Sequence, residues 1–466
     1  METSIRMKGL FNASVLALTA FLVHLISAYI SGPDTALYYF LLLFVWRYAR
    51  FLINLVAFWL YTPATLGANQ QPTYQPSRDV TVILPTVDPT GPDFMECLLT
   101  CVANSPAEIH IVTAGDALYR TTKSVIAPLR YRFLSIRLRV SRTQVASKRA
   151  QVAHAIPLVT TAFTVLLDDH VFWKPNFLTS LLLPFEDANI GLVGTNKAVR
   201  RLDNLSLRAR FWNMIGAIYL LRHNFEIRAS NTVDGGVFVV SARTCALRTE
   251  IIQDPAFLAG YTREMFFFGL LGPLNASDDN FVTRWVVQRG WGIKIQYTAD
   301  AEIETTIGVA EPIEKKFLGQ CRRWARSTWK SNVTSLVRDG RVWATQPYCV
   351  YAVFLTSFTN FAAVVDPALV YFLRSSVSFG NSGNATAVLI AWIFFTKIFK
   401  VFSYFRKHPQ DIWMFPGYLA FAYAHSFIKF WALLTFWDVK WSGRNLDAIA
   451  VDTTGESSDN EMVANE

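Results

Sequence analysis

The sequence predicts an α/β domain inserted between membrane-spanning helices. Long apolar stretches lie near both ends of the 466-residue chain, and between them short apolar runs alternate with helical patterns. Hydrophobic residues make up 52% of the chain and charged residues only 17%. Ordinary soluble domains carry roughly 25% charged residues, so this shortfall indicates contact with lipid. The alternation in the middle predicts a mostly parallel, doubly wound sheet.

The first 61 residues are expected to hold two membrane segments. Residues 13–30 are almost uncharged and about long enough to cross a bilayer. A second apolar stretch at 36–61 follows at once, so a cleavable signal peptide fits poorly. Arg47 and Arg50 interrupt this second stretch. They lie either at the membrane interface or along a polar path inside the bundle, as charges within spans usually do.

The middle of the chain, residues 62–345, is expected to be one cytosolic domain that ends in an interfacial helix. A linker rich in proline and glycine opens it. The apolar runs that predict strands are 79–84, 109–115, 131–140 and 163–169, and helical patterns lie at 91–104 and 143–158. Ligands of such a sheet bind at the carboxyl ends of its strands.

Apolar stretches return at 347–373, 386–404 and 412–437, which predict about three C-terminal membrane segments. Lysines and arginines around 397–407 indicate that the connection between the last two segments is cytosolic. The chain therefore reads as a multi-pass membrane protein, and the plasma membrane is its expected location.

The remaining segments add two expectations. Beyond the C-terminal membrane region, residues 346–438, the acidic stretch 439–466 is expected to be disordered. Asn384 begins the sequon considered for glycosylation, because its loop would face outward.

Charge and cysteine content narrow the classes of partner. The formal net charge of +9 suits anionic lipid headgroups or an anionic nucleotide. No basic run or recognition motif favours nucleic acid. The cysteines are scattered, do not complete a zinc site and are expected to be reduced thiols; they are Cys97, Cys101, Cys245, Cys321 and Cys349.

An acidic pair, Asp168 and Asp169, follows the fourth predicted strand and precedes His170. Carboxylates at a strand end can hold Mg²⁺ or Mn²⁺, and such an ion neutralises a diphosphate leaving group. A histidine ligand fits Mn²⁺ better than Mg²⁺, although His170 would equally serve as a hydrogen-bonding residue. Alternatively, the pair has no catalytic role and only caps a helix or adds charge to the surface.

A second acidic pair, Asp278 and Asp279, opens a predicted helix at 280–289, with Ser277 as its expected N-cap. Acidic residues in a first helical turn favour the macrodipole, which explains the pair without any chemistry. The functional interpretation makes one of them a general base that removes a proton from an acceptor hydroxyl. A helix N-terminus can also position a base, so the two interpretations are compatible.

The third motif is Gln-x-x-Arg-Trp, formed by Gln320, Arg323 and Trp324. Spacings of three and four residues place these side chains on one face of a helix. Arg323 can bind a diphosphate bidentately, Trp324 offers a flat surface to a sugar, and Gln320 offers a hydrogen bond. Alternatively, the surrounding arginines and tryptophans form a basic amphipathic helix that rests on lipid.

These motifs, in this order and between membrane spans, resemble the type 2 glycosyltransferases, which include the cellulose, chitin and hyaluronan synthases. The motifs of this chain most resemble those of fungal membrane glycosyltransferases related to capsular-polysaccharide synthases. The segments that carry this resemblance are PTVDPTG, SKRAQ, DDHVFWKP, VDGGVFVVSART, SDDNFVTRW and QCRRW. The resemblance covers roughly residues 80–330 in motifs and the rest in the layout of spans.

The resemblance implies a nucleotide-diphospho-sugar transferase fold of the GT-A type and a UDP-sugar donor. Each candidate residue then takes a role from the family motif that it matches. The resemblance implies that the uridine contacts Thr86, Asp88 and Asp116, that the phosphates contact Lys148, and that the metal is held by Asp168, Asp169 and His170. It implies that the catalytic base is Asp279. It also implies that the diphosphate and the acceptor end are held by Gln320, Arg323 and Trp324, and that the acceptor side is lined by Gly235 and Gly236.

Two positions depart from the family pattern. The family usually has an acidic residue where His170 stands, and the second strand ends in VTAGD rather than in paired aspartates, which weakens Asp116 as a uridine contact. A gating-loop motif like that of the cellulose synthases is not found.

Three functions follow for comparison. The leading hypothesis is an inverting transferase that lies in membrane lipids, extends a β-linked glycan and exports this glycan for the cell wall or surface. The second is an enzyme that adds one sugar to a lipid acceptor, as ceramide glucosyltransferases do. The third, a transporter with a cytosolic domain, draws on Arg47 and Arg50, but the apolar stretches show no repeat.

Overall fold

The computed structural model describes His24 and residues 34–202, 204–267 and 269–438. These residues form two compact units, each built from segments that are separated in the sequence. The sheet unit contains Thr62–Arg200 and Val239–Ile307. The helical unit contains Arg201–Phe238 and Gly308–Phe436 together with the described residues up to Tyr61.

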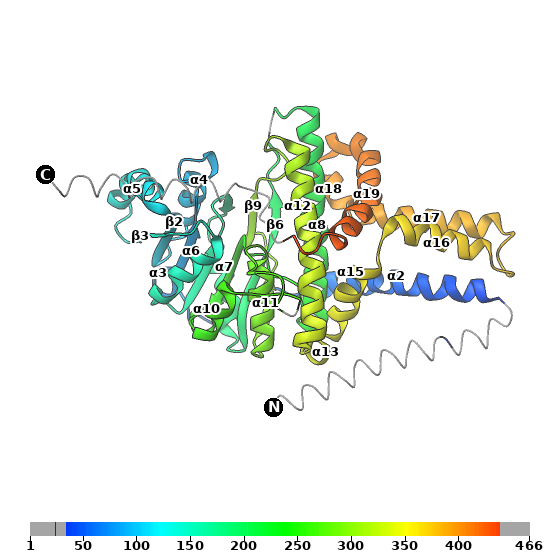
Figure 1. Cartoon of the computed structure of the whole chain (residues 1–466), viewed down its shortest axis with the longest axis horizontal. Coiled ribbons are helices and arrows are strands. Elements are labelled where there is room, and N and C mark those ends of the chain that lie inside the picture. Colours follow the sequence, from blue (N-terminus) through cyan, green and yellow to red (C-terminus); the bar gives the residue numbers. More distant parts are fainter. Residues whose placement is uncertain (1–23, 25–33, 203, 268, 439–466) are drawn as a thin grey trace. The chain divides into compact units, whose positions relative to one another are not determined.

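A nine-stranded sheet forms the centre of the sheet unit (Figure 1). Its strands lie in the order β3-β2-β1-β4-β7-β6-β9-β5, and β8 pairs with β6. The strands are β1 (Val80–Pro85), β2 (Glu108–Ala114), β3 (Arg137–Thr143), β4 (Phe163–Leu167), β5 (Val171–Trp173), β6 (Ile190–Val199), β7 (Thr244–Arg248), β8 (Gly292–Gln296) and β9 (Glu302–Thr305).

The sheet is parallel from β3 through β4, as the sequence predicts, and mixed beyond that point. Strand β7 runs antiparallel to both β4 and β6, and β5 runs antiparallel to β9. Strands β8 and β9 pair with β6 in parallel. The antiparallel strands join segments that are distant in the sequence, and local apolar patterns do not specify such partners.

The third predicted strand, 131–140, begins too early. Residues up to Arg132 complete helix α5 (Gly115–Arg132), and β3 starts only at Arg137. Leu134, in the connection, is 85% exposed. Apolar residues at the end of a helix and at the start of a strand thus merge into one run in the sequence.

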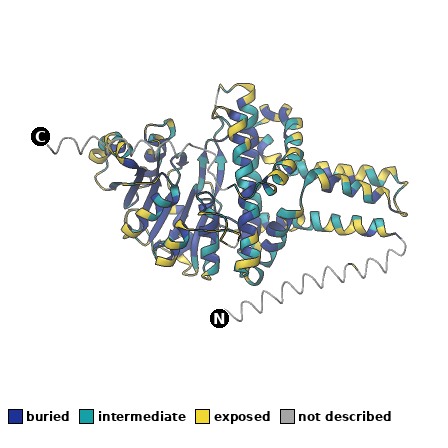
Figure 2. Ribbon diagram, viewed as in Figure 1, coloured by how far each residue is buried: buried dark blue, intermediate teal, exposed yellow. Residues whose placement is uncertain are grey.

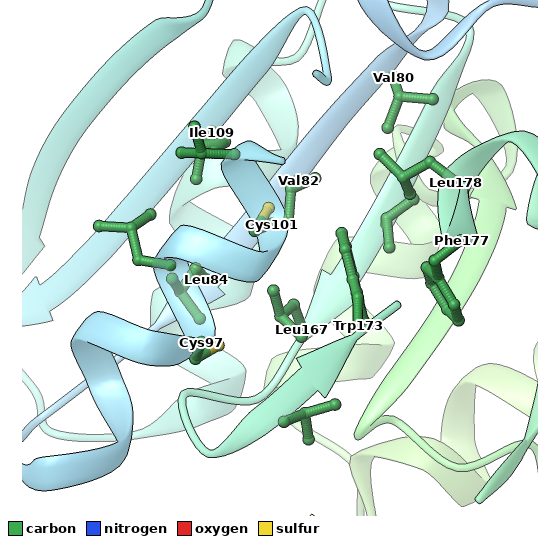
Figure 3. Packing of buried hydrophobic residues seen from close by; sticks show 14 of the residues in the cluster. Val80, Val82, Leu84, Cys97, Cys101, Ile109, Leu167, Trp173, Phe177 and Leu178 are labelled. Carbon is green, nitrogen blue, oxygen red and sulfur yellow. The ribbon is translucent and has the colours of Figure 1, made fainter. Parts of the chain in front are cut away.

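Buried apolar residues of the sheet unit form a core to which β1, β2, β4, β5, α4 and α7 contribute (Figure 3). Every residue of β1 is buried, and its sequence VTVILP is rich in the β-branched residues that suit a buried strand. Cys97 and Cys101 lie one turn apart on α4 and pack with Val82 and Ile109. Burial raises the pKa of the Cys101 thiol, so this cysteine acts as a small apolar residue.

Two helices of the sheet unit lie within the helical patterns of the sequence: α4 lies within 91–104, and α6 lies within 143–158. The helices of this unit are α3 (Pro76–Asp79), α4 (Pro92–Val102), α5, α6 (Lys148–Ala155), η1 (Ile156–Leu158), α7 (Phe177–Leu182), η2 (Leu183–Glu186), α9 (Thr249–Ile252), α10 (Pro255–Thr262) and α11 (Asp278–Gln288).

The helical unit combines long apolar helices with the two helices α8 and α12. Its helices are α2 (Thr35–Leu60), α8 (Leu207–Asp234), α12 (Ile313–Val333), η3 (Thr334–Asp339), α13 (Val342–Thr345), α14 (Pro347–Cys349), η4 (Val350–Leu355), α15 (Thr356–Thr359), α16 (Ala362–Arg374), α17 (Gly383–Phe399), α18 (Phe402–Lys407), η5 (Pro409–Met414) and α19 (Phe415–Leu433). Figure 2 shows exposed residues along α2, α16 and α17.

Among the described residues, α2 is the one helix long and apolar enough to cross a membrane. It begins where the Asp34 side chain accepts a hydrogen bond from the backbone N–H of Leu37, 3.1 Å away. The expected span at 347–373 is broken instead: Pro347–Thr359 and Ala362–Arg374 meet at 90° and pass the same test only as a pair. The expected segment 13–30 and the acidic tail 439–466 lie outside the described residues.

The two arginines of α2 point to partners inside the helical unit. Arg47 forms an ion pair with Asp366 of α16. Arg50 donates to the carbonyl oxygen of Ala352 and to Thr356 Oγ1, both at 2.8 Å. These contacts favour the second interpretation of the arginines, in which they face the interior of a helix bundle.

Candidate active site

Two strand ends meet through Thr86. The Thr86 hydroxyl donates to Asp169 Oδ2 at 2.8 Å and accepts from the backbone N–H of Asp88 at 3.1 Å. Strands β1 and β4 are parallel neighbours, so their carboxyl ends lie at the same edge of the sheet. Thr86 and Asp169 are buried, whereas Asp88 is exposed. The structure thus brings three sequence-predicted residues together.

Lys148 connects the two acidic pairs. Its Nζ lies 2.6 Å from Asp168 Oδ1 and 3.1 Å from Asp278 Oδ2, and it donates to the carbonyl oxygen of Ala242 at 3.2 Å. Asp168 follows β4 and Asp278 opens α11, so a single ammonium group links segments about a hundred residues apart in the sequence. Neither acidic pair is therefore merely a surface charge.

Burial alone would lower the pKa of Lys148. The carboxylates of Asp168 and Asp278 outweigh burial and hold that pKa well above its ordinary value. Lys148 therefore remains a cation between two anions. Its predicted contact with phosphates stays a prediction, because its ammonium faces carboxylates in this structure.

The residues after β4 suit a divalent cation in their chemistry. Asp168 and Asp169 supply the carboxylate oxygens that Mg²⁺ and Mn²⁺ prefer, and Asp168 Oδ1 already accepts a cationic group. His170 Nδ1 lies 3.1 Å from Asp169 Oδ1. Across the described ranges no group of three or more His, Cys, Asp or Glu side chains is arranged to hold one ion. The two carboxylates of Asp168 and Asp169 therefore suit a metal ion, and His170 is hydrogen-bonded to one of these carboxylates.

Asp279 lies in the first turn of α11, which begins two residues before the predicted helix. Its Oδ1 accepts hydrogen bonds from the backbone N–H of Asn280 at 2.9 Å and from Asn280 Nδ2 at 3.2 Å. Ser277 occupies the expected N-cap position, but it has a φ of 67° and makes no side-chain capping bond to the helix. The positive end of the helix dipole therefore acts on Asp279.

Lys197 is a charged neighbour of Asp279 that the sequence did not reveal. It is buried on β6, and its electrostatic neighbours include Arg243 and Asp279. Burial, followed by the positive charge of Arg243, lowers the pKa of Lys197 to about 7, while Asp279 opposes this shift. Lys197 on β6 is thus one positive group near Asp279.

Asp116 follows β2, the parallel neighbour of β1 in the sheet. It is in the first turn of α5, after Gly115 with a φ of 71°. Its Oδ1 pairs with Arg142 Nε at 2.5 Å, and both side chains are largely exposed. Its role as a uridine contact remains a prediction.

Two residues of the SKRAQ motif besides Lys148 also position the site. Gln151 Nε2 donates to the carbonyl oxygens of Thr86 and Val112, at 2.9 and 2.8 Å, and so ties the ends of β1 and β2 together. Arg149 NH2 bonds to Glu264 Oε2 at 2.6 Å and to the carbonyl oxygen of Ala276 at 3.1 Å, just before Asp278. The SKRAQ motif could have indicated these roles: Arg149 and Gln151 are buried polar residues on the short helix α6.

The Gln-x-x-Arg-Trp motif belongs to the helical unit. Gln320, Arg323 and Trp324 lie on α12, as their spacing predicts. The ring of Trp324 lies 5.0 Å from that of Tyr219 on α8, centroid to centroid. The aromatic surface expected for a sugar is therefore backed by another ring.

Gly235 and Gly236 also lie in the helical unit, at the end of α8. Gly235 has a φ of 72° and closes the helix with a hydrogen bond to the carbonyl oxygen of Asn231. A Cβ on Gly236 would lie 2.5 Å from the Cβ of Cys349. Packing against α14 thus explains why Gly236 has no side chain.

Comparison with known proteins decides the family. Residues 78–327 match the family described as "Glycosyltransferase like family 2". A type 2 glycosyltransferase of Pyricularia oryzae is 37% identical over 415 residues, which cover 87% of this chain and 81% of that protein. This chain belongs to glycosyltransferase family 2. A second type 2 glycosyltransferase, of Gibberella zeae, is 38% identical and covers 88% of this chain and 76% of its own.

This glycosyltransferase also matches a more distant relative and a solved structure. The NDP-glycosyltransferase ltbB of Aspergillus luteorubrus is 31% identical over 274 residues, 58% of this chain and 64% of that protein. The mannosyltransferase PcManGT of Pyrobaculum calidifontis, solved with GDP-Man and Mn²⁺, superimposes with a TM-score of 0.50 at 15% identity and covers 84% of this chain and 97% of its own. The likeness confirms the predicted GT-A type fold.

Proposed function

We propose that this glycosyltransferase is embedded in a membrane and transfers a sugar from a UDP-sugar onto a growing β-linked polysaccharide. The transfer inverts the anomeric configuration, uses Mn²⁺ or Mg²⁺, and supplies a glycan that is exported for the cell wall or surface. Family membership supports sugar transfer. The donor, the metal, the stereochemistry and the acceptor are proposed.

The observation that carries the proposal is the position of Lys148. Its ammonium lies 2.6 Å from Asp168 and 3.1 Å from Asp278. Asp279 directly follows Asp278 in α11. One cation thereby links Asp168, a candidate metal-binding carboxylate, to Asp278, the residue before the candidate base. A donor site beside a general base needs such proximity.

For the donor, we assign the strand-end residues Thr86 and Asp88, with Asp116, to the uridine, and Asp168 and Asp169 to the ion. When bound, a divalent ion neutralises the charge of a departing diphosphate. The PcManGT structure, solved with GDP-Man and Mn²⁺, belongs to a protein of the same fold. In the helical unit, the proposed roles rest on the family motif: Gln320, Arg323 and Trp324 hold the diphosphate and the acceptor end, and Gly235 and Gly236 line the acceptor side.

The chemistry assigned to this chain is the movement of one proton. The Asp279 carboxylate takes the proton of the acceptor hydroxyl while that oxygen attacks the anomeric carbon opposite the diphosphate. The new carbon–oxygen bond forms as the bond from that carbon to the diphosphate oxygen breaks, and UDP leaves with the electron pair. The hydrogen bonds from Asn280 hold the carboxylate in one orientation.

Membrane attachment is proposed through residues 1–61 and 346–438, with residues 62–345 as the cytosolic domain. Helix α2 and the bent pair Pro347–Thr359 and Ala362–Arg374 support it by length and composition. Exposed apolar side chains along α2, such as Val45 at 58% and Trp59 at 67%, are those of a helix that faces lipid. Glycosylation at Asn384, which is exposed in the first turn of α17, is part of the same proposal.

A single addition to a lipid acceptor is the second candidate. It draws on the broken helices of the C-terminal region, since α17 has only 17 residues and the preceding segment bends by 90°. A short bundle of this kind suits a lipid that approaches from the bilayer. Labelled UDP-sugar distinguishes the two candidates: long radioactive chains identify a polymerase, and one sugar on extracted lipid identifies the lipid transferase.

The proposal is tested by Asp279→Asn in the purified full chain. We expect transfer to fall about 10²–10⁴-fold, the usual contribution of a general base. UDP binding should remain within about threefold of wild type, because the amide keeps the shape of the side chain. Asp300→Asn is the control, since Asp300 is exposed in the same unit, and it should transfer at the wild-type rate. Wild-type turnover by Asp279→Asn would refute the assignment of the base.

A further inference from the structure

The interior of the helical unit holds more positive than negative charge. The basic side chains come from four helices, α2, α8, α17 with its C-terminal end, and α19. Each lies within electrostatic range of others in the group. We call them the basic cluster: Arg47, Arg50, Arg222, Lys397, Lys400 and Lys429, with Asp366 and Glu226 as the acidic groups recorded beside them.

Asp366 is already engaged by two cations. It forms an ion pair with Arg47 and lies 2.9 Å from Lys397 Nζ, and its Oδ2 accepts from the Tyr423 hydroxyl at 2.9 Å. Both carboxylate oxygens of Asp366 thus have partners, and the residue is only 4% exposed. Asp366 therefore cannot neutralise the rest of the basic cluster.

Arg50 and Lys429 bond to neutral atoms. Arg50 donates to the carbonyl oxygen of Ala352 and to Thr356 Oγ1, both at 2.8 Å. Lys429 Nζ donates to the carbonyl oxygen of Ser357 at 2.6 Å. Carbonyl and hydroxyl oxygens accept hydrogen bonds but carry no full negative charge. Most of the free-energy cost of removing the two cations from water therefore remains.

Lys400 is the most isolated of these cations. Its ammonium lies 5.3 Å from the centre of the Phe51 ring, and for the part of the chain that the structure describes no hydrogen bond or ion pair to it is recorded. Its charged neighbours are Arg222, Arg50 and Arg47, with Glu226 as the acidic one. A half-buried ammonium among like charges is costly unless an anion approaches it.

We propose that the basic cluster binds a phosphate group, held by Lys400, Arg50 and Arg222. A phosphate carries up to two negative charges. The six basic side chains share only two carboxylates, Asp366 and Glu226, so the cluster keeps an excess of positive charge that a phosphate would offset. Guanidinium groups bind phosphate oxygens bidentately, and an ammonium adds a compact point charge. The residues of this site are not among those assigned to the donor, and its existence does not depend on sugar transfer.

Two sources present such a group. A membrane lipid offers a phosphate monoester beside apolar chains, and the exposed apolar residues of α2 and α17, such as Val45 and Val388, suit those chains. A soluble phosphate or pyrophosphate offers the same oxygens without the chains. The proposal concerns the phosphate group, and the experiment separates its sources.

The full chain is reconstituted in nanodiscs of phosphatidylcholine alone, of phosphatidylcholine with phosphatidic acid, and of phosphatidylcholine with inorganic pyrophosphate in solution. The melting temperature is measured for wild type, Lys400→Gln, Arg50→Gln and the control Lys407→Gln. Lys407 is an exposed lysine of the same unit, so its variant loses one positive charge outside the basic cluster.

A phosphate probe should raise the melting temperature of wild type and of Lys407→Gln by several degrees. Lys400→Gln should be at least as stable as wild type without a probe, because an unpaired charge is removed, and its apparent affinity for the probe should fall at least tenfold. A shift with phosphatidic acid alone identifies a lipid phosphate, and a shift with pyrophosphate alone identifies a soluble one. No shift of wild type with either probe, or equal shifts in wild type and Lys400→Gln, would overturn the proposal.

Discussion

Lys148 shows what residue types alone do and do not reveal. The sequence marks Asp168, Asp169 and Asp279 as candidates because carboxylates follow a strand or open a helix. It also marks Lys148 through the resemblance, but as a phosphate contact. Its bridge between Asp168 and Asp278 is a three-dimensional contact of segments far apart in the chain. No local pattern encodes such a contact.

The bridge predicts a stability effect for Lys148→Met. Removing one partner of a buried charged pair costs about 3–5 kcal/mol, and the partial exposure of Lys148 and Asp168 places this case near the lower end. Sugar transfer should also fall, because Asp168 and Asp278 then repel each other. Chemical unfolding measures the first effect and UDP release the second.

The control for this variant is Lys123→Met. Lys123 is exposed on α5, where its ammonium lies 4.4 Å from the Tyr119 ring. Its loss should change the free energy of unfolding by about 0.5 kcal/mol or less. If Lys148→Met unfolds at the same denaturant concentration as Lys123→Met, the bridge does not contribute as described.

At the scale of elements, strands that are buried along their whole length were the most predictable. β1, β2 and β4 follow the predicted runs within one or two residues, because buried parallel strands are continuous apolar segments. β3 was misplaced, since the end of α5 and the start of the strand share one run. The antiparallel position of β7 between β4 and β6 depends on pairing across the sheet, which periodicity does not contain.

The junction of α8 and α14 yields a prediction at the same scale. In Gly236→Ala the new Cβ would lie 2.5 Å from the Cβ of Cys349 and 3.0 Å from that of Gln346, so the helices must shift. Overpacking of this kind costs about 1–3 kcal/mol. A thermal melt of the full chain should show the loss.

Gly319→Ala is the matched control for that variant. Gly319 lies inside α12 with no atom within 4 Å of an added Cβ, so alanine should stabilise the helix by about 0.5–1 kcal/mol. An unchanged melting temperature in Gly236→Ala, together with lost transfer, would instead favour the acceptor-side role implied by the resemblance.

For the whole molecule, the sequence suggests membrane segments on either side of one continuous domain, which stays a proposal. The described residues form two compact units that alternate along the chain, with α8 and α12 grouped with the apolar helices. Packing of α12 against α19 explains this grouping.

The number of membrane segments stays a prediction, because the expected segment 13–30 lies outside the described residues. One described helix passes the test of length and composition, or two if the bent pair counts as one span. Hydropathy identified the apolar stretches. The break near Asn360 and Phe361 falls in the segment TSFTNFA, where Thr356, Ser357, Thr359 and Asn360 interrupt the apolar run. Family and fold were predictable because the motifs occur in a fixed order.

The central claim is that the site bridged by Lys148 transfers a sugar from a nucleotide donor. The most direct measurement is UDP release by the purified full chain in lipid, with a panel of UDP-sugars and Mn²⁺, for wild type and Asp279→Asn. We predict release from at least one donor by wild type and a fall of about a hundredfold or more in the variant. Release from none of the donors, or equal release by both proteins, would contradict the account.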